Sequence, residues 1–191
     1  MERFGLTLIT APVEEPVSLA EAKARLQVTI GDMDTDIDAL IRESRGAAES
    51  EVGRAFLAQT WAMTLDGFPC GRSIDLPRPP LASVAWVKYY DADGVQQTLD
   101  AASYYVATGS EPGRLVLKAG RAWPVAELGR PESVEVRFTA GVSSRSLLSP
   151  LVVAAVKLIM SARWENPTGE GVDIPPAARR ILNGLETGKV W

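Results

Sequence analysis

Residues 76–94, LPRPPLASVAWVKYYDADG, constrain the fold more than any other part of the chain. Pro77, Pro79 and Pro80 fix the backbone φ angle and lack an N–H donor, so this piece is neither helix nor central strand. The following residues, 83–90, are rich in β-branched and aromatic side chains, which favours a strand. The sequence DADG at 91–94 is typical of a tight turn. A strand, a turn and a returning strand at 95–99 are therefore predicted.

The same strand-like pattern extends over a longer region around this stretch. Apolar and polar side chains alternate at 61–65 and again at 134–138, which is the period of a half-buried strand. Shorter candidate strands occur at 73–76, 104–107 and 114–118. Pro and Gly residues separate these segments, which indicates a small antiparallel β-sandwich or barrel within residues 57–142.

Helical patterns flank this β region on both sides. Ser18 and Glu21 have the spacing of a capping box, which predicts a short helix reaching about Val28. Apolar positions at 37–52 fall on one helical face, and Gly53 is a typical stop, so a helix over 35–52 is expected, capped by Asp34 or Thr35. Residues 1–16 are compatible with a short edge strand or an extended arm.

The C-terminal third again has a helical pattern. Ser149 and Pro150 are typical of a helix start, and residues 151–164 are apolar on nearly all sides. Such a helix is buried inside the fold or at a subunit interface. The interface candidates are Val152, Val156, Ile159 and Trp164. The fold class is therefore predicted as α+β, with a helical core formed by 1–56 and 143–191 and an inserted β domain at 57–142.

Composition argues against most enzymatic and cofactor chemistry. The chain has 191 residues, no histidine and one cysteine, Cys70. The commonest general base and metal ligand is therefore missing, and the lone thiol has no histidine to activate it. We expect no catalytic residue, no cofactor and no metal. The net charge of −4 argues against a broad electrostatic grip on nucleic acid, and no apolar run reaches the roughly 18 residues of a membrane span.

Two motifs invite a different interpretation. Asp32, Asp34, Asp36 and Asp38 alternate like the ligands of a calcium loop, but Ile37 occupies the place where that loop needs glycine, so an acidic first helical turn is favoured. Asp66, Asp75, Asp91 and Asp93, together with the five tryptophans, leave a carbohydrate-binding or hydrolytic β module as an alternative.

An ordered series of short motifs resembles the head–tail adaptors, also called head-completion or connector proteins, of long-tailed bacteriophages and gene transfer agents. The motifs are EPVSLAEAK at 15–23, DALI at 38–41, QTW at 59–61, LPRPPL at 76–81, YYDADG at 89–94, WP at 123–124, FTAG at 138–141 and WEN at 164–166. Residues 183–191 lack the Tyr-Arg pair that such relatives often carry there.

The resemblance implies a structural virion protein rather than an enzyme. It implies a ring of about a dozen copies at the head–tail junction, assembled in the bacterial cytoplasm, between the portal protein and the next tail-joining protein (the stopper or tail terminator). It also implies that DNA passes through the ring without specific binding and that no membrane is involved. Another phage structural subunit, such as a tail terminator or baseplate protein, stays open as an alternative.

Two hypotheses follow from the resemblance. The C-terminal segment would dock on the portal, with Arg179, Arg180, Leu185, Val190 and Trp191 as the docking residues. Acidic residues such as those at 32–38 would line the channel, where negative charge keeps DNA from sticking.

Overall fold

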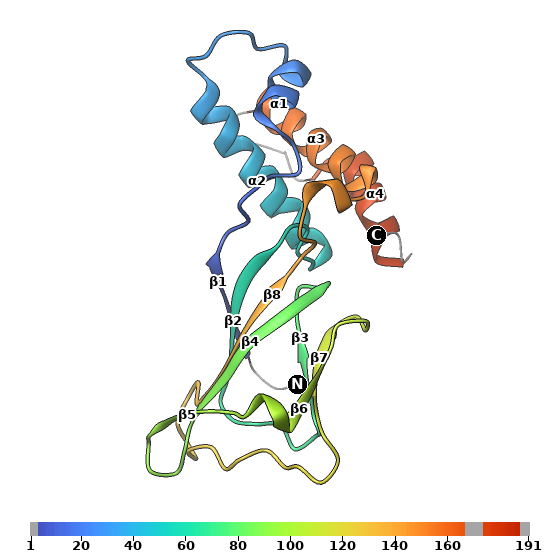
Figure 1. The fold of residues 1–191 in the computed structure, drawn as a ribbon. Coiled ribbons are helices and arrows are strands. Elements are labelled where there is room, and N and C mark those ends of the chain that lie inside the picture. The colour runs from blue at the N-terminus through green and yellow to red at the C-terminus, as the bar shows by residue number, and fades with distance from the viewer. Residues whose placement is uncertain (1–3, 167–173, 188–191) are drawn as a thin grey trace. The chain divides into compact units, whose positions relative to one another are not determined.

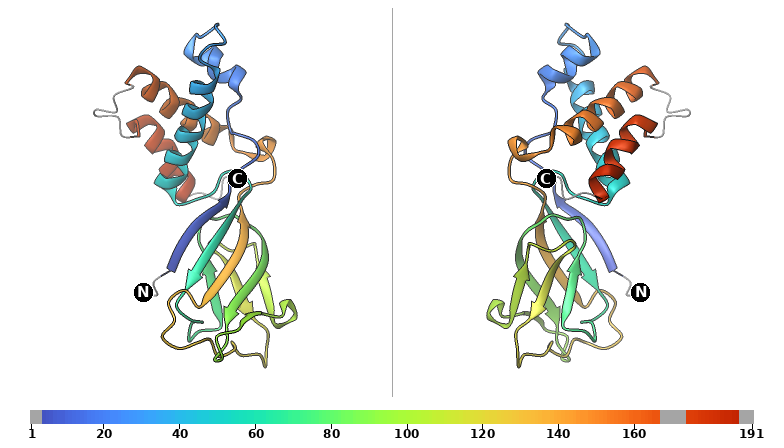
Figure 2. Two further views of the ribbon diagram at one scale, coloured as in Figure 1. Left: turned by 90° about the vertical axis from the view of Figure 1, so that its left-hand side faces the viewer. Right: turned by 90° about the vertical axis from the view of Figure 1, so that its right-hand side faces the viewer.

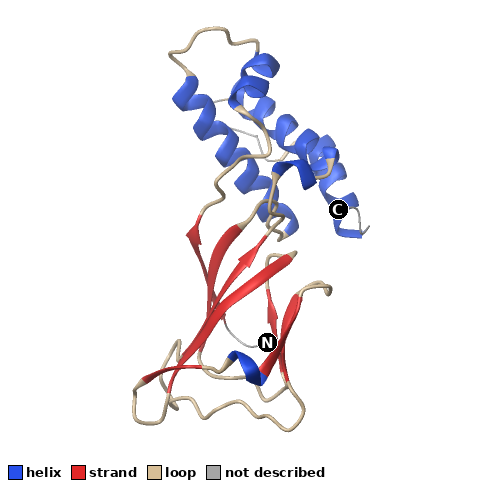
Figure 3. Ribbon diagram, viewed as in Figure 1, coloured by secondary structure: helices blue, strands red, loops and turns tan. Residues whose placement is uncertain are grey.

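The structure is a computed structural model that describes residues 4–166 and 174–187 (Figure 1). The helices are α1 (Leu19–Leu26), α2 (Asp34–Val52), α3 (Pro150–Glu165) and α4 (Pro176–Thr187), with short 3₁₀ turns η1 (Ala101–Ser103) and η2 (Arg145–Leu147). The strands are β1 (Phe4–Thr10), β2 (Gln59–Leu65), β3 (Ser73–Leu76), β4 (Leu81–Tyr90), β5 (Gln96–Thr98), β6 (Tyr104–Ala107), β7 (Gly113–Leu117) and β8 (Val134–Ala140). Figure 3 separates helices and strands by colour. The predicted α+β class is confirmed.

The chain forms two compact units. One, the β unit, contains the residues up to 12 together with 58–141, and the other, the helical unit, contains 13–57 together with the residues from 142 onward. The short edge strand expected within residues 1–16 is present: residues 4–10 form β1, which pairs with β2 from Phe4 opposite Leu65 to Thr10 opposite Thr60. This pairing places the segment in the β unit, whereas the predicted division counted all of residues 1–56 with the helical core.

The helices of the helical unit begin and end largely where their local chemistry predicts. The Ser18 hydroxyl accepts a hydrogen bond of 3.3 Å from the Glu21 N–H, and the Ser18 N–H donates to the Glu21 carboxylate at 3.0 Å, which completes the capping box. Gly53 ends α2 at φ +65°, a conformation that favours glycine. The expected side-chain cap of α2 is wrong: Asp34 is already helical, and Met33 at the cap position provides no side-chain acceptor.

The core of the helical unit lies mainly between α2, α3 and α4, with Ala22 of α1 buried in the same cluster. Its fully buried side chains include Ile37, Ile41, Ala48, Val152, Val156, Ile159, Ala178, Leu182 and Leu185. Helix α3 is apolar on most sides because α2 and α4 of the same chain both pack against it. The cover that this helix needs is thus provided largely within the helical unit.

The β unit contains two antiparallel sheets. The five-stranded sheet has the order β1-β2-β8-β4-β5, and the three-stranded sheet has the order β3-β7-β6 (Figure 2). Alternation is clear in β8, where Val134, Val136 and Phe138 are fully buried and the residues between them are not. The predicted turn joins β4 to β5, with Gly94 at φ +74° and the Asp91 carboxylate accepting from the Val95 N–H at 2.9 Å.

Strands β4 and β7, one from each sheet, approach closely at a single glycine. A Cβ atom added at Gly113 would lie 2.3 Å from the Leu81 Cβ, which is closer than real atoms come. Glycine is therefore required at the start of β7 because a Leu81 side chain of β4 occupies the space beside it.

Candidate interaction surfaces

The acidic segment at 32–38 lies at the start of α2 and is mostly solvated. Asp32, Asp36 and Asp38 are exposed, whereas Asp34 accepts a hydrogen bond of 2.5 Å from the Lys23 ammonium. Within the described ranges, no group of three or more Asp, Glu and Cys side chains is placed to hold a metal ion. This segment is therefore an exposed negative surface at a helix N-terminus, where the helix dipole favours such charge.

One of the carboxylates considered for hydrolytic chemistry, that of Asp91, forms hydrogen bonds within the β4–β5 turn. The Asp91 carboxylate accepts from the Gln97 amide at 2.8 Å and from two backbone N–H groups of the turn. These hydrogen bonds, led by the one from Gln97, hold the pKa of Asp91 below its ordinary value. Asp91 therefore closes the β4–β5 turn as an ionised acceptor.

In the part of the chain that is described, no helix is long and apolar enough to cross a membrane.

Glu21 is the centre of a charged cluster in the helical unit. Its carboxylate accepts hydrogen bonds from the Arg145 guanidinium, at the start of η2, and from the Lys157 ammonium of α3 at 3.2 Å. The pKa of Glu21 is lowered to about 2, first by the backbone N–H and the hydroxyl of Ser18 and then by Arg145 and Lys157. The Arg145 N–H also donates to the Glu14 carboxylate at 2.6 Å. These contacts fix η2 against α1 and α3.

A shallow groove lies beside this cluster. It is lined by Glu14, Ser144, Arg145, Ser146, Leu148, Pro150 and Val153. Leu147 and Leu151 next to it are 57% and 48% exposed. The groove therefore combines a charged rim with uncovered aliphatic side chains, which is a composition suited to contact with another protein.

The predicted docking residues fall into three environments. Arg179 donates a hydrogen bond of 2.6 Å to the Glu51 carboxylate of α2, and Arg180 is exposed. Leu185 is only 2% exposed and belongs to the helical core, so it has no surface to offer a partner. Val190 and Trp191 lie outside the described residues.

The predicted subunit-interface residues on α3 are also mostly internal. Val152, Val156 and Ile159 are at most 1% exposed, and Trp164 is half-buried against the same core. Three of these four side chains are therefore covered by their own chain. The exposed apolar surface around α3 lies instead at its N-terminal end, on Leu147 and Leu151.

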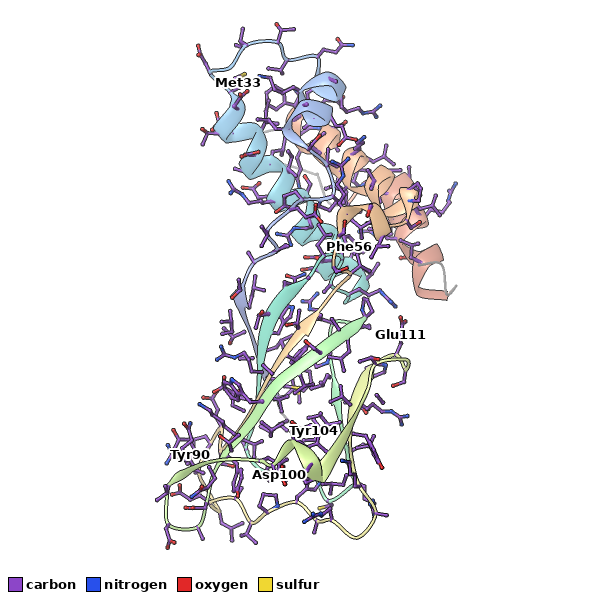
Figure 4. All side chains as sticks on the ribbon, viewed as in Figure 1. Met33, Phe56, Tyr90, Asp100, Tyr104 and Glu111 are labelled. Atoms are coloured by element: carbon purple, nitrogen blue, oxygen red, sulfur yellow. The ribbon has the colours of Figure 1, made fainter. Side chains whose placement is uncertain are left out.

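The outer face of the five-stranded sheet carries stacked aromatic and cationic side chains. The Lys88 ammonium lies 4.6 Å and the Arg137 guanidinium 4.9 Å from the centre of the Trp86 ring. At the end of β4, where Figure 4 labels Tyr90, the Arg130 guanidinium lies 3.5 Å from the Tyr90 ring. These cation–π contacts hold long side chains flat on the sheet.

A pocket of about 240 Å³ opens beside Tyr90 on this face. Lys88 and Arg130 line it together with Glu132 and Glu135, so its charges largely balance. This lining offers both positive and negative side chains for contacts with a partner, and it does not contain a nucleophile paired with a general base. This surface is not among the sites predicted from the sequence, although Trp86, Lys88 and Tyr90 at every second position of a strand indicate a shared face.

The chain is similar to known proteins at the level of structure. No protein-family model matches the chain, and no curated protein matches it. Chains in solved structures share the fold, and three of them are described here. A chain in the "Neck of empty GTA particle computed with C6 symmetry" has a TM-score of 0.78 at 24% identity, over 98% of this chain and 97% of that chain.

The other two similar chains come from native particles. One is in the "Neck of native GTA particle computed with C12 symmetry", with a TM-score of 0.76 at 22% identity over 98% of this chain and 97% of that one. The other is in the "Virion of native gene transfer agent (GTA) particle", with a TM-score of 0.74 at 23% identity over 97% of each chain. The resemblance noted in the sequence is thus confirmed at the level of fold, over nearly the whole chain.

Proposed function

We propose that this chain is a head–tail adaptor, a structural subunit that forms a ring between the portal and the tail of a gene transfer agent or long-tailed phage. The observation that carries the proposal is the shared fold with chains of gene transfer agent particles, which extends over both units. In this proposal the two sheets form the inserted β-sandwich of the adaptor, which the contact between Gly113 and Leu81 supports. The protein works through its surfaces and catalyses no reaction.

A ring of about a dozen copies is consistent with the symmetry applied to the similar structures. Two of them are necks, computed with C6 and with C12 symmetry. Identical subunits close into a ring when each uses two different surfaces, one for each neighbour. The groove beside Arg145, with Leu147 and Leu151, is one candidate for such a surface in the helical unit.

The portal-docking segment is proposed to be the end of α4 and the residues that follow it. Arg180 is exposed and free to meet an acidic partner surface, and Arg179 is held in place by Glu51. Leu185 is removed from the docking set because it is part of the helical core. The docking residues are therefore Arg179, Arg180, Val190 and Trp191.

A truncation tests docking, and not folding, only if it keeps the buried Leu185. A chain ending after Thr187 keeps Leu185 and should fold with unchanged stability, but it should no longer join filled heads to tails in a complementation assay. Arg180→Glu should weaken joining in the same direction. Normal joining by both variants would refute the docking role while leaving the ring itself untouched.

The exposed acids at 32–38 are proposed to face the DNA channel. Asp32, Asp36 and Asp38 have no described partner that would neutralise them, so they present negative charge to solvent. Replacing the three by Lys should slow DNA passage or ejection, because Lys forms phosphate contacts. In the control, the exposed Asp93 and Glu132 of the β unit are replaced by Lys. If this control slowed DNA passage as much as the changes at 32–38, the placement of the acids at 32–38 in the channel would be contradicted.

A further inference from the structure

The five-stranded sheet ends in two free strands of very different character. Strand β5, at one edge, has only three residues, all polar and exposed. Strand β1, at the other edge, has seven residues without a charge or a proline, FGLTLIT. Natural proteins usually protect such an edge with lysine, proline or a very short strand. Within the described residues, β1 has none of these three features and pairs with β2 on one side only, and its one irregularity is a register shift between Leu8 and Thr10 near its C-terminal end.

The side chains of β1 are also uncovered. Phe4, Leu8 and Ile9 are 50%, 41% and 44% exposed, although their neighbours on β2 are mostly buried. An added strand would cover this apolar surface and would satisfy the outward N–H and C=O groups of β1 at the same time. Edge and side chains therefore point to the same kind of occupant, which is another β-strand.

A second edge with matching properties exists in the three-stranded sheet. Strand β6 lies at the end of the order β3-β7-β6 and consists of uncharged residues, YYVA. Tyr105 and Val106 are 61% and 38% exposed. The opposite edge, β3, carries the exposed Asp75 and is a poorer match for an apolar strand. Five of the twelve exposed large apolar side chains among the described residues lie on β1 and β6.

The two matching edges lie on different sides of the β unit. Strand β6 follows β5 through η1, and β5 is at the far end of the sheet from β1. Figure 1 shows β1 on the left and β6 on the right of the β unit. Two different surfaces on opposite sides are what a head-to-tail contact needs, whereas pairing of β1 with another β1 would close a two-fold dimer.

We infer that β1 of one copy pairs with β6 of the next copy, so that the sheets continue from subunit to subunit around the ring. The inference rests on the proposed ring function and adds the surface through which the β units join. A second copy of this chain is the occupant because it supplies an uncharged, exposed edge that matches the uncharged edge of β1.

Hydrogen exchange tests the backbone pairing directly. Amide exchange is measured in the free full-length chain and in purified rings, isolated alone or on portal-bearing heads. Residues 4–10 and 104–107 should exchange at least about tenfold more slowly in rings, the change that about 1.4 kcal/mol of local stabilisation produces. Strand β5, an edge of the same sheet that is not used, is the internal control and should show no change.

Cross-linking determines which edges meet. In a Cys70→Ser background, Thr7→Cys and Tyr105→Cys chains are treated with a short bismaleimide. The mixture of the two single variants should give a covalent dimer, and the double variant should give a ladder of higher species. Dimers from Thr7→Cys alone would show β1–β1 pairing and overturn the inference. Thr7→Cys mixed with Gln96→Cys, on the polar edge, serves as the negative control.

A charge placed on the edge provides a third readout. Ile9→Lys should reduce ring yield, whereas Ile30→Lys, an exposed isoleucine of the helical unit, should not. Rings that form without protection of β1 or β6 would overturn strand pairing and leave the adaptor function standing. Failure of the wild-type chain to form rings even on portal-bearing heads would instead refute the adaptor function, and the pairing with it.

Discussion

The Glu49 carboxylate accepts a hydrogen bond of 2.7 Å from the backbone N–H of Phe56, the residue labelled in Figure 4 where the chain leaves α2 for β2. The same carboxylate pairs with the Arg45 guanidinium at 2.6 Å, and Arg45 also pairs with Glu15 at 2.7 Å. Burial alone would lower the pKa of Arg45, but Glu15 and Glu49 hold that pKa above its ordinary value. A buried charge cluster therefore fixes the exit of α2.

Replacing Glu49 by Leu should destabilise the protein strongly. The side chains of Glu49 and Arg45 are only 7% and 8% exposed, so the substitution leaves a buried N–H at Phe56 and weakens the pairing of a buried cation. We expect a loss of about 3–5 kcal/mol in the free energy of unfolding, measured by urea denaturation. Glu43→Gln, which removes an exposed ion pair of 3.7 Å with Arg163, should change it by less than about 1 kcal/mol. Equal effects of the two substitutions would contradict the role of the cluster.

The stability of the helical unit should depend on pH through Glu21. Its pKa is about 2 in the folded chain, below its ordinary value of 4.5. A carboxylate with a lowered pKa contributes stability that is present above the unfolded pKa and is lost as the pH falls toward the folded one. The free energy of unfolding should therefore decrease from about pH 5 to pH 2, and it should do so less steeply in Glu21→Gln. Parallel pH profiles for the wild type and Glu21→Gln would contradict the lowered pKa of Glu21, and with it the hydrogen bonds from Ser18, Arg145 and Lys157 to which it is attributed.

Gly113→Ala should destabilise the β unit. The added methyl group would lie 2.3 Å from the Leu81 Cβ, and the sheets must shift to admit it. Overpacking of this kind costs about 1–3 kcal/mol, which thermal unfolding would detect. Gly46→Ala is the matched control, because Gly46 is inside α2 with open space around it, and there the change should stabilise by about 0.5–1 kcal/mol. A neutral Gly113→Ala would mean that the close contact is absent in solution.

Truncation at the C-terminus should separate folding from docking. A chain ending after Gly184 loses Leu185, which is 2% exposed in the core, and its free energy of unfolding should fall by about 2–5 kcal/mol. A chain ending after Thr187 should unfold like the full-length protein. Leu185→Ala in the full chain checks the cause, because it should reproduce most of the loss. Full stability after the shorter truncation would contradict the placement of Leu185.

Local signals in the sequence predicted most of the secondary structure. The capping box at Ser18, the stop at Gly53, the turn ending at Gly94 and the Ser149 helix start all appear as expected, because each depends on residues a few positions apart. The placement of residues 4–10 beside β2 depends on pairing across about 60 positions, which the local pattern does not encode.

The functional residues were harder to predict than the fold. An apolar helix has the same pattern whether its own chain or a neighbour covers it, so Val152, Val156 and Ile159 were assigned to an interface although they are core residues. The docking role of Leu185 is predicted only from the resemblance, which implies that the C-terminal segment docks and does not distinguish its buried residues from its exposed ones. Exposure, the property that separates these cases, depends on packing between distant segments and is available only from the structure.

Electron microscopy of the purified chain bound to its portal would show whether this chain forms a ring at the neck of a particle. We expect a closed ring of about a dozen copies between the portal and the first tail component, with the same two-unit fold in each copy. Particles whose necks lack the chain, or that hold it as isolated copies without rotational symmetry, would contradict this expectation.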